Sequence, residues 1–204
     1  MKIITITKKD LNENNEYKKG NIGTYSQHED AHVEIEANLG WVGFKGLYVK
    51  GHIQALAGSG ITAGDGITAG DGITAVDGIT AGWGITAGDG ITAGDGITAG
   101  WGITAGWGIT AGSGITAGWG IEVGLSIICK GILSFKYRLF AGTATWKKDV
   151  TDEETKVECG KLERGTIVHG KLIELGLPDK GEEITEEITE EIIELNGVKY
   201  KKII

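Results

Sequence analysis

Carboxylates and tryptophans recur at every sixth residue in the middle of this chain, and they are the side chains best placed to bind a partner. The carboxylates are Asp65, Asp71, Asp77, Asp89 and Asp95, and tryptophan takes the same position at Trp83, Trp101, Trp107 and Trp119. A row of carboxylates could bind Ca²⁺, but the glycine- and aspartate-rich calcium repeats have a period of nine and carry more carboxylates in each turn. Tryptophans at exposed positions are enriched at binding surfaces. The pattern therefore favours a binding surface over a metal site.

Residues that could perform catalysis do not form a recognisable set. His28 and His32 are four residues apart, but the local sequence is not helical and offers no evident third metal ligand. Cys129 lies in an apolar stretch typical of a core strand, and Cys159 has no neighbouring histidine to activate it. Gly-x-Gly recurs without the lysine or the strand–helix context of a phosphate loop. We therefore expect a chain that is not an enzyme, with no bound metal and no cofactor.

Ten consecutive hexads of the form Ile-Thr-Ala-Gly-x-Gly occupy residues 61–120. Apart from the variable fifth position, the only departure is Val76, which replaces a glycine. The hexads hold 19 of the 36 glycines of the chain, which has a single proline. Collagen is excluded, because it needs glycine at every third residue and abundant proline. Aliphatic residues continue the spacing of six into both flanks, at Val49, Ala55, Ile121, Ile127, Leu133 and Leu139.

A period of six predicts short strands that stack into a β-solenoid. An α-helix has a period of 3.6, and two glycines per hexad would cost a helix about 2 kcal/mol. In a strand, Ile and Ala point to one face and Thr to the other, while Gly-x-Gly fits a corner at which positive φ is cheap for glycine. One such unit cannot form a core alone. Successive coils must therefore share a core, with Ile inside and Thr outside.

The variable fifth position favours coils of three hexads, which corresponds to a period of 18. At this period Trp83, Trp101 and Trp119 align on one edge with Asp65, whereas at a period of 12 Asp95 interrupts the row of tryptophans. Two other arrangements remain open, a meander of short hairpins and a trimer of intertwined chains. The tryptophans either form an exposed binding edge, or they cover the glycine-rich core or pack on the flanking strands.

Two known patterns resemble the repeat. The left-handed β-helix of hexapeptide-repeat acyltransferases also has an aliphatic anchor every six residues. In those enzymes the residue two positions before the anchor is small and points inward, whereas in this chain that residue is Asp, Trp or Ser. These enzymes use a catalytic histidine beside the helix, and no histidine lies between His52 and His169. The string Gly-Ile-Thr-Ala-Gly-Trp-Gly-Ile-Glu-Val-Gly-Leu-Ser-Ile, followed by Phe-Lys-Tyr-Arg-Leu-Phe-Ala-Gly, is similar to uncharacterised proteins of Firmicutes and their phages. This resemblance covers residues 50–145 and implies a mobile-element setting without a catalytic residue.

Three regions are expected: N-terminal strands and a cap (1–54), the hexad solenoid (55–126) and a strand-rich C-terminal cap (127–204). Alternating apolar and polar residues in both caps predict flanking antiparallel strands, and residues 8–31 predict a loop.

The acidic tail ends in a predicted β-hairpin. Asn196-Gly197 within the string Ile-Glu-Leu-Asn-Gly-Val-Lys-Tyr-Lys is typical of a type I′ turn. Residues 182–191 could be helical, because Ile184, Ile188 and Ile192 are spaced by four, or extended.

The net charge and the cysteine content of the chain argue against several classes of function. A net charge of −8 argues against binding to nucleic-acid phosphates, and two cysteines are too few for a disulfide scaffold. Neither a signal peptide nor a transmembrane run is evident. We expect a cytoplasmic homo-oligomer in a bacterial host that binds a host protein or a small ligand and touches neither nucleic acid nor membrane. The leading hypothesis is a non-enzymatic phage or mobile-element protein that interferes with host defence. The alternatives are a self-assembling or virion spike or adhesin module, then an ice-binding protein or an acyltransferase of the hexapeptide type.

Overall fold

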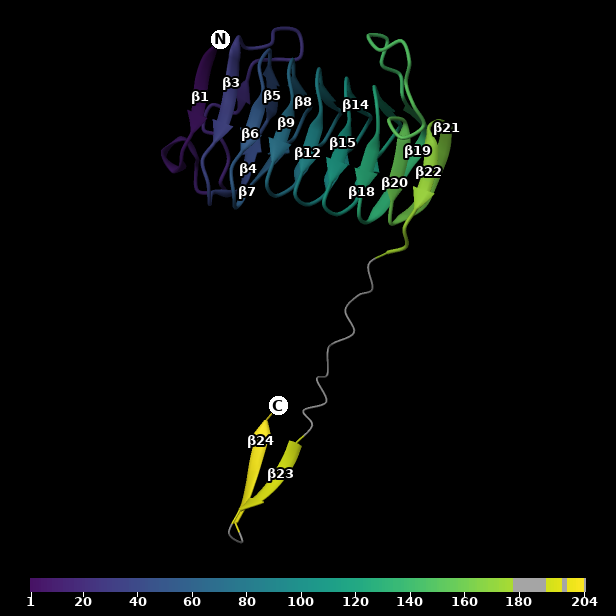
Figure 1. Ribbon diagram of the computed structural model, residues 1–204. Coiled ribbons are helices and arrows are strands. Elements are labelled where there is room, and N and C mark those ends of the chain that lie inside the picture. Colours follow the sequence, from purple (N-terminus) through teal and green to yellow (C-terminus); the bar gives the residue numbers. More distant parts are fainter. Residues whose placement is uncertain (178–189, 196–197, 204) are drawn as a thin grey trace.

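The chain folds into a parallel β-solenoid, in which successive coils stack along one axis (Figure 1). The computed structural model describes residues 1–177, 190–195 and 198–203. Within the repeat, each strand pairs in parallel with the strand three hexads later, as Ile79 does with Ile97. The predicted β-solenoid with three hexads per coil is therefore confirmed. The parallel pairing also excludes a meander of hairpins, and a single chain closes its own coils.

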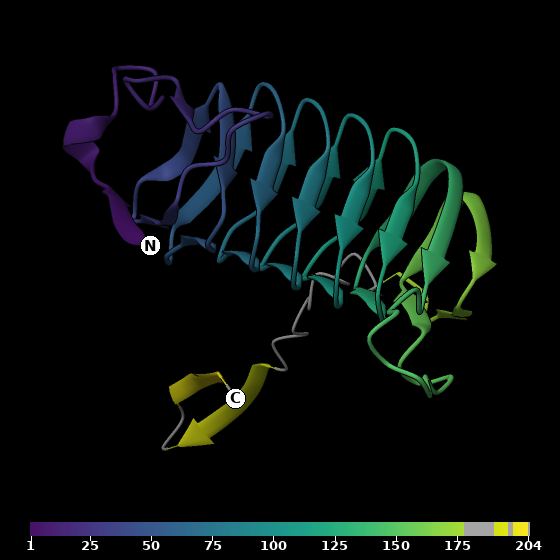
Figure 2. The same ribbon diagram turned by 90° about the horizontal axis from the view of Figure 1, so that it is seen from above.

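Three faces run along the axis, and consecutive strands occupy them in turn (Figure 2). The first face is a sheet of β1 (Lys2–Ile6), β3 (Ala31–Ile35), β6 (Ile53–Ala55), β9 (Ile73–Ala75), β12 (Ile91–Ala93), β15 (Ile109–Ala111), β18 (Ile127–Cys129), β20 (Lys156–Cys159) and β22 (Lys171–Glu174). The second face carries β4 (Gly40–Phe44), β7 (Ser59–Ala63), β10 (Ile79–Ala81), β13 (Ile97–Ala99) and β16 (Ile115–Ala117). The third face carries β2 (Asn21–Ile22), β5 (Gly46–Val49), β8 (Ile67–Ala69), β11 (Ile85–Ala87), β14 (Ile103–Ala105) and β17 (Ile121–Val123). The long strand β19 (Ile132–Ala141) joins the second and third faces, because it pairs first with β16 and then with β17.

The Ile-Thr-Ala triplet separates inside from outside as predicted. In β12, Ile91 and Ala93 are buried and Thr92 is exposed. Ile91 pairs directly with the isoleucines of the coils before and after it, which builds a ladder of stacked isoleucines. Burying one such side chain stabilises the fold by about 1.5–3 kcal/mol. The resulting core is one continuous cluster from Ile6 to Cys159.

Close approach between coils explains the glycine at the fourth position of the hexads. No glycine in residues 61–120 has a positive φ, whereas Gly58 and Gly142 outside the repeat do. A Cβ at Gly88 would lie 1.8 Å from the carbonyl oxygen of Gly70 in the preceding coil. The expectation that these corners exploit positive φ is therefore wrong. At the fourth hexad position from Gly70 onward, glycine is needed because a methyl group would overlap the main chain of the neighbouring coil, whereas most glycines of the sixth position would make only tight contacts of 3.1–3.4 Å.

The strands that flank the repeat are further coils of the same solenoid. β1 pairs with β3 in parallel, and β20 pairs in parallel with both β18 and β22. β21 (Lys161–His169) follows β19 in parallel around the last coil. The expectation of antiparallel strands in the flanks is thus corrected. Their alternating pattern had indicated strands, but alternation does not distinguish the direction in which strands pair.

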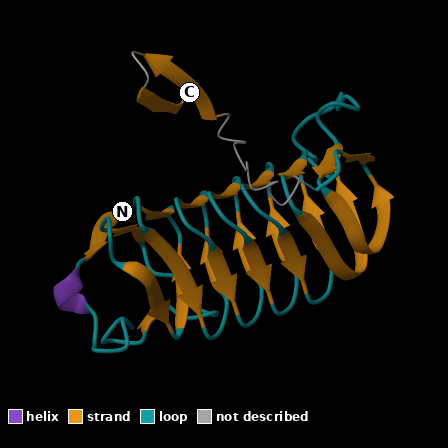
Figure 3. Cartoon of the chain, turned by 90° about the horizontal axis from the view of Figure 1, so that it is seen from below, coloured by secondary structure: helices purple, strands orange, loops and turns teal. Residues whose placement is uncertain are grey.

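The predicted loop at residues 8–31 is an irregular N-terminal segment with two short elements, which ends where β3 begins at Ala31. They are the 3₁₀ helix η1 (Lys8–Asp10), drawn in purple in Figure 3, and the two-residue strand β2. Thr7 caps the helix, because its hydroxyl accepts the backbone N–H of Lys9 while the Asp10 carboxylate accepts the backbone N–H of Thr7. The segment brings Tyr17 against Phe44 of β4, with ring centroids 5.7 Å apart.

The predicted C-terminal hairpin is confirmed by β23 (Glu190–Leu195) and β24 (Val198–Ile203), which pair antiparallel. Its expected turn at Asn196-Gly197 lies outside the described residues. So does the part of the acidic segment at 182–189, while residues 190 and 191 belong to β23. Among the described residues, no helix has the length and apolar character needed to cross a membrane.

Candidate functional site

The variable residues of the hexads lie at three corners between the faces. The first corner joins the second face to the third and carries Asp65, Trp83, Trp101 and Trp119. The second corner, between the third and first faces, carries Asp71, Asp89 and Trp107. The third corner carries Asp77, Asp95 and Ser113. The structure therefore brings three of the four predicted tryptophans together and places the fourth on another corner.

Trp83, Trp101 and Trp119 form a continuous stack, here called the aromatic edge. Their ring centroids are 5.6 Å and 5.4 Å apart, with interplanar angles of 9° and 10°. Backbone hydrogen bonds of 3.0 Å and 3.1 Å link the same residues from coil to coil, which fixes the spacing of the rings. The three side chains are 45%, 50% and 54% exposed. The tryptophans thus form an exposed edge and do not cover the core.

The two ends of the aromatic edge differ in chemistry. At one end the ring of Tyr137 meets Trp119 edge-on, with centroids 6.4 Å apart. The ammonium of Lys136 lies 5.1 Å from the centroid of the Tyr137 ring. At the other end the corner position before Trp83 is held by Asp65, which is half-buried. The edge therefore runs from a half-buried carboxylate to an aromatic ring beside a cation.

An open groove of about 360 Å³ lies beside the aromatic edge on the third face. Its floor follows one outward column of the sheet, in which Tyr48, Thr68 and Thr86 are register partners. Tyr25, from the irregular N-terminal segment, meets Tyr48 edge-on at 6.3 Å. The complete lining is Tyr25, Tyr48, Gly66, Thr68, Trp83, Gly84, Thr86 and Trp101. Four aromatic side chains and two threonine hydroxyls, with no charged side chain among them, suit a ring-bearing or apolar group.

A separate pair of tryptophans lies on the side of the third face opposite the aromatic edge. Trp107 at the second corner lies 5.6 Å from Trp146, with an interplanar angle of 33°. Trp146 belongs to the loop between β19 and β20, which Lys147 and Glu154 close through an ion pair. That contact, together with hydrogen bonds from Thr151, lowers the pKa of Glu154 to about 2. The loop forms a cavity of about 270 Å³ over Thr104 and Glu122.

The five aspartates do not converge on one point, since they are spread over the three corners. His32 does not form a pair with His28. It lies beside His52 and Asp71, and ligand atoms of His32, His52 and Asp71 are all within 4.8 Å of one another. The ring of His28 stacks on Tyr48 at 6.1 Å. His52 and Asp71 are far from His32 in the sequence, so the spacing of these three residues does not form a recognisable metal-binding motif.

Both cysteines are buried in the core, as expected for Cys129. Burial raises the pKa of the Cys129 thiol to about 12, and burial also raises the pKa of Cys159. A nucleophilic cysteine needs a depressed pKa and access to solvent. The environments of these two thiols therefore favour a structural role.

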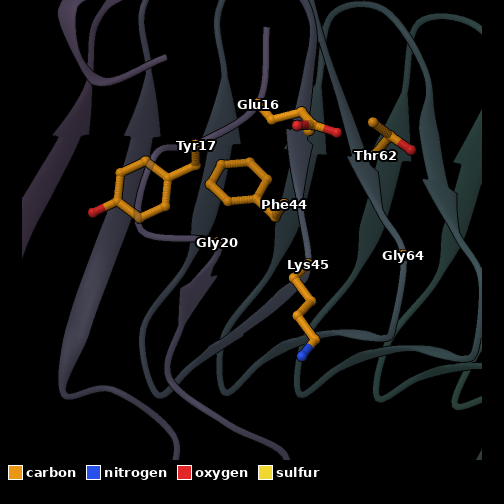
Figure 4. Close-up of a pocket in the computed structure, with 8 residues that line it drawn as sticks. Glu16, Tyr17, Gly20, Phe44, Lys45, Thr62 and Gly64 are labelled. Atoms are coloured by element: carbon orange, nitrogen blue, oxygen red, sulfur yellow. The ribbon is translucent and has the colours of Figure 1, made fainter. Parts of the chain in front are cut away.

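Another hollow of about 370 Å³ lies where the N-terminal segment crosses the second face (Figure 4). The rings of Tyr17 and Phe44 lie side by side in it, and the side chains of Glu16 and Lys45 extend in different directions. Its lining also includes Thr62, Gly20, Gly43 and Gly64. The packed rings indicate that this hollow is a seam between the N-terminal segment and the coils.

Comparison of the chain with family models, curated proteins and solved structures finds no match. The sequence had indicated the aromatic edge through its period, but it did not indicate Tyr25, Tyr48 or Trp146. These residues lie outside the hexads, and no repeat relates them to the tryptophans that they approach.

Proposed function

We propose that this chain is a non-catalytic binding protein that recognises its partner through the aromatic edge and the adjoining groove. Residues 50–145 resemble proteins of Firmicutes and their phages, and on that basis we propose that the protein belongs to a phage or mobile element and blocks a component of host defence. The observation that carries the proposal is the exposed stack of Trp83, Trp101 and Trp119.

The stack has the physical properties of a recognition surface. Tryptophan offers a large contact area at a low cost in side-chain entropy, and it is enriched among residues that dominate binding energy. Here the rings are held in place by the coil spacing, so little further ordering is needed when a partner binds. About half of each side chain is open to solvent in the free protein. Covering that surface would supply the hydrophobic part of the binding energy.

The groove gives the surface a place for an anchor. Its volume of about 360 Å³ would accommodate one ring-bearing side chain or a small ligand against Tyr48 and Trp83. The threonine hydroxyls of its floor can donate or accept hydrogen bonds and would orient a polar group of the partner.

Charge narrows the choice of partner. Residues 61–120 contain five aspartates and no lysine or arginine. A polyanion would therefore meet no compensating charge along the repeat, whereas a neutral or cationic partner surface would be tolerated. These features support a protein surface or a small ligand as the partner.

A comparative pull-down tests the proposal. The wild-type chain, the Trp83→Ala/Trp101→Ala variant and the Asp95→Ala/Ser113→Ala control are immobilised and exposed to lysate of a bacterial host. The control alters the same hexad position on the third corner. We expect a partner that is retained by wild type and control and lost by the tryptophan variant, measured by quantitative mass spectrometry. Circular dichroism verifies that all three are folded, and identical partner lists would refute a role for the aromatic edge.

A further inference from the structure

His32, His52 and Asp71 form a cluster of ligating side chains on the second corner, separate from the aromatic edge. They come from three successive coils, because His32 lies in β3, His52 precedes β6, and Asp71 precedes β9. One ligand atom from each lies within 4.8 Å of the others, and all three residues are half-buried. Two imidazoles and a carboxylate from different coils thus meet in one place.

The coil length in this part of the solenoid produces the cluster. Val33 pairs with Ile53 and Ile53 with Ile73, so each of these coils is longer than the three hexads of a regular coil. His32 directly precedes Val33, His52 directly precedes Ile53, and Asp71 lies two residues before Ile73, so these three residues follow one another along the corner. The imidazole rings of His32 and His52 have centroids 4.2 Å apart and an interplanar angle of 34°.

We propose that His32, His52 and Asp71 bind one divalent transition-metal ion of the Zn²⁺ class. Imidazole nitrogen together with carboxylate oxygen suits Zn²⁺ and its neighbours in the first row, whereas Ca²⁺ and Mg²⁺ require oxygen ligands. Three protein ligands leave the fourth tetrahedral position to water. The site does not depend on the function proposed for the aromatic edge.

Coordination requires small side-chain movements. Two ligands each about 2.0–2.1 Å from a tetrahedral ion lie about 3.4 Å apart, so atoms separated by up to 4.8 Å must close by rotating about their side-chain bonds. His32 must also exchange one hydrogen bond, since its Nδ1 accepts the backbone N–H of His52 at 3.1 Å. An ion bound in this way would join three coils near the N-terminal end of the solenoid. Because it binds the folded state, it would raise the unfolding temperature.

Zinc titration of the full chain without an affinity tag tests the site. Isothermal titration calorimetry with Zn²⁺ should show one ion per chain, and thermal unfolding should shift upward in the presence of Zn²⁺. Asp71→Asn and His52→Gln should each weaken the affinity at least about tenfold. Binding of Co²⁺ should give visible d–d absorption that the same two variants lose. Cys129 and Cys159 are buried and do not compete for the ion in the folded chain.

Asp77→Asn and His169→Gln are the matched controls, because these residues lie on another corner and in the last coil. Both controls should bind Zn²⁺ as the wild type does. Circular dichroism in the absence of metal establishes that each variant is folded. A wild-type chain that binds no Zn²⁺ at micromolar concentrations would overturn the site. Equal weakening by Asp77→Asn and Asp71→Asn would also overturn it, because the ion would then be held by surface charge in general.

Discussion

At the residue scale, the space between coils determines which glycines of the repeat can be replaced. A Cβ on Gly88 would lie 1.8 Å from the main-chain oxygen of Gly70, a distance that no side-chain rotation can relieve. Gly88→Ala should therefore lower the free energy of unfolding by roughly 1–3 kcal/mol, as overpacking of a rigid interior does. Chemical denaturation monitored by circular dichroism measures this change.

Gly64→Ala is the matched control at the same position of the first hexad. There the nearest atom to an added Cβ is the Lys45 carbonyl oxygen at 3.6 Å, an ordinary contact. The backbone has no positive φ at this residue, so alanine should be neutral or stabilise the protein slightly by restricting the unfolded chain. Equal destabilisation by both substitutions would show that contact between coils is not the reason for these glycines.

At the scale of elements, the loop between β19 and β20 is expected to respond to acid. Its Glu154 carboxylate pairs with Lys147, and the pKa of Glu154 is lowered from 4.5 to about 2. A group with a depressed pKa stabilises the ordered loop above its ordinary pKa and loses that effect as the pH falls through the lowered value. The loop should therefore loosen between about pH 4.5 and pH 2 and separate Trp146 from Trp107.

The indole N–H resonance of Trp146 reports this separation in NMR spectra, with Trp101 as a reference on a different corner. Glu154→Gln removes the titrating group, so its Trp146 resonance should resemble the loosened state already at neutral pH. If the Trp146 resonance of that variant still shifts with pH over the same range, a group other than Glu154 controls the loop.

The hexads made the main elements predictable from the sequence. An aliphatic residue every six positions determines strand length, inward side chains and the alignment of Trp83 with Trp101, because each coil repeats the one before it. The direction of the flanking strands did not follow from the sequence, since alternation is the same in parallel and antiparallel sheets.

Contacts made by aperiodic segments could not be predicted in this way. Tyr25 reaches the groove from the irregular N-terminal segment, whose path depends on tertiary contacts. His32 meets His52 because their coils are longer than three hexads, and the hexad period predicts the wrong partner for such coils. The sequence predicts that the glycines lie at corners, but the physical reason for them depends on the carbonyl positions of the neighbouring coil.

At the scale of the whole molecule, the solenoid is a one-dimensional stack in which each coil contacts only its neighbours. The core of the repeat is the same on all three faces, because every hexad supplies Ile and Ala to it. Removal of whole hexads should consequently leave a folded, shorter solenoid. The number of hexads removed determines which corner residues align afterwards.

Two internal deletions test this coupling between length and alignment. Removal of residues 85–102, which is one coil of three hexads, should place Trp119 directly after Trp83 on the first corner. Removal of residues 85–96, which is two hexads, should turn all later strands by one face and place Ser113 after Trp83. Both chains should retain the far-ultraviolet circular dichroism of parallel strands, because every Ile still meets an Ile. In the shorter deletion Trp101 and Trp119 remain one full coil apart and stay stacked.

The Trp83→Ala substitution in each deleted chain distinguishes the two alignments. Stacked indoles couple their electronic transitions, so loss of a stacked partner changes the circular dichroism of the aromatic bands. In the chain lacking residues 85–102, Trp83→Ala should remove the coupled signal of the first corner, because Trp83 and Trp119 are the pair that remains there. In the chain lacking 85–96 the same substitution should leave the coupled signal unchanged, since Ser113 then follows Trp83 on its corner. The opposite pattern would mean that the tryptophans find one another independently of the coil register, and the aromatic edge would then not be a rigid surface set by the period of the repeat.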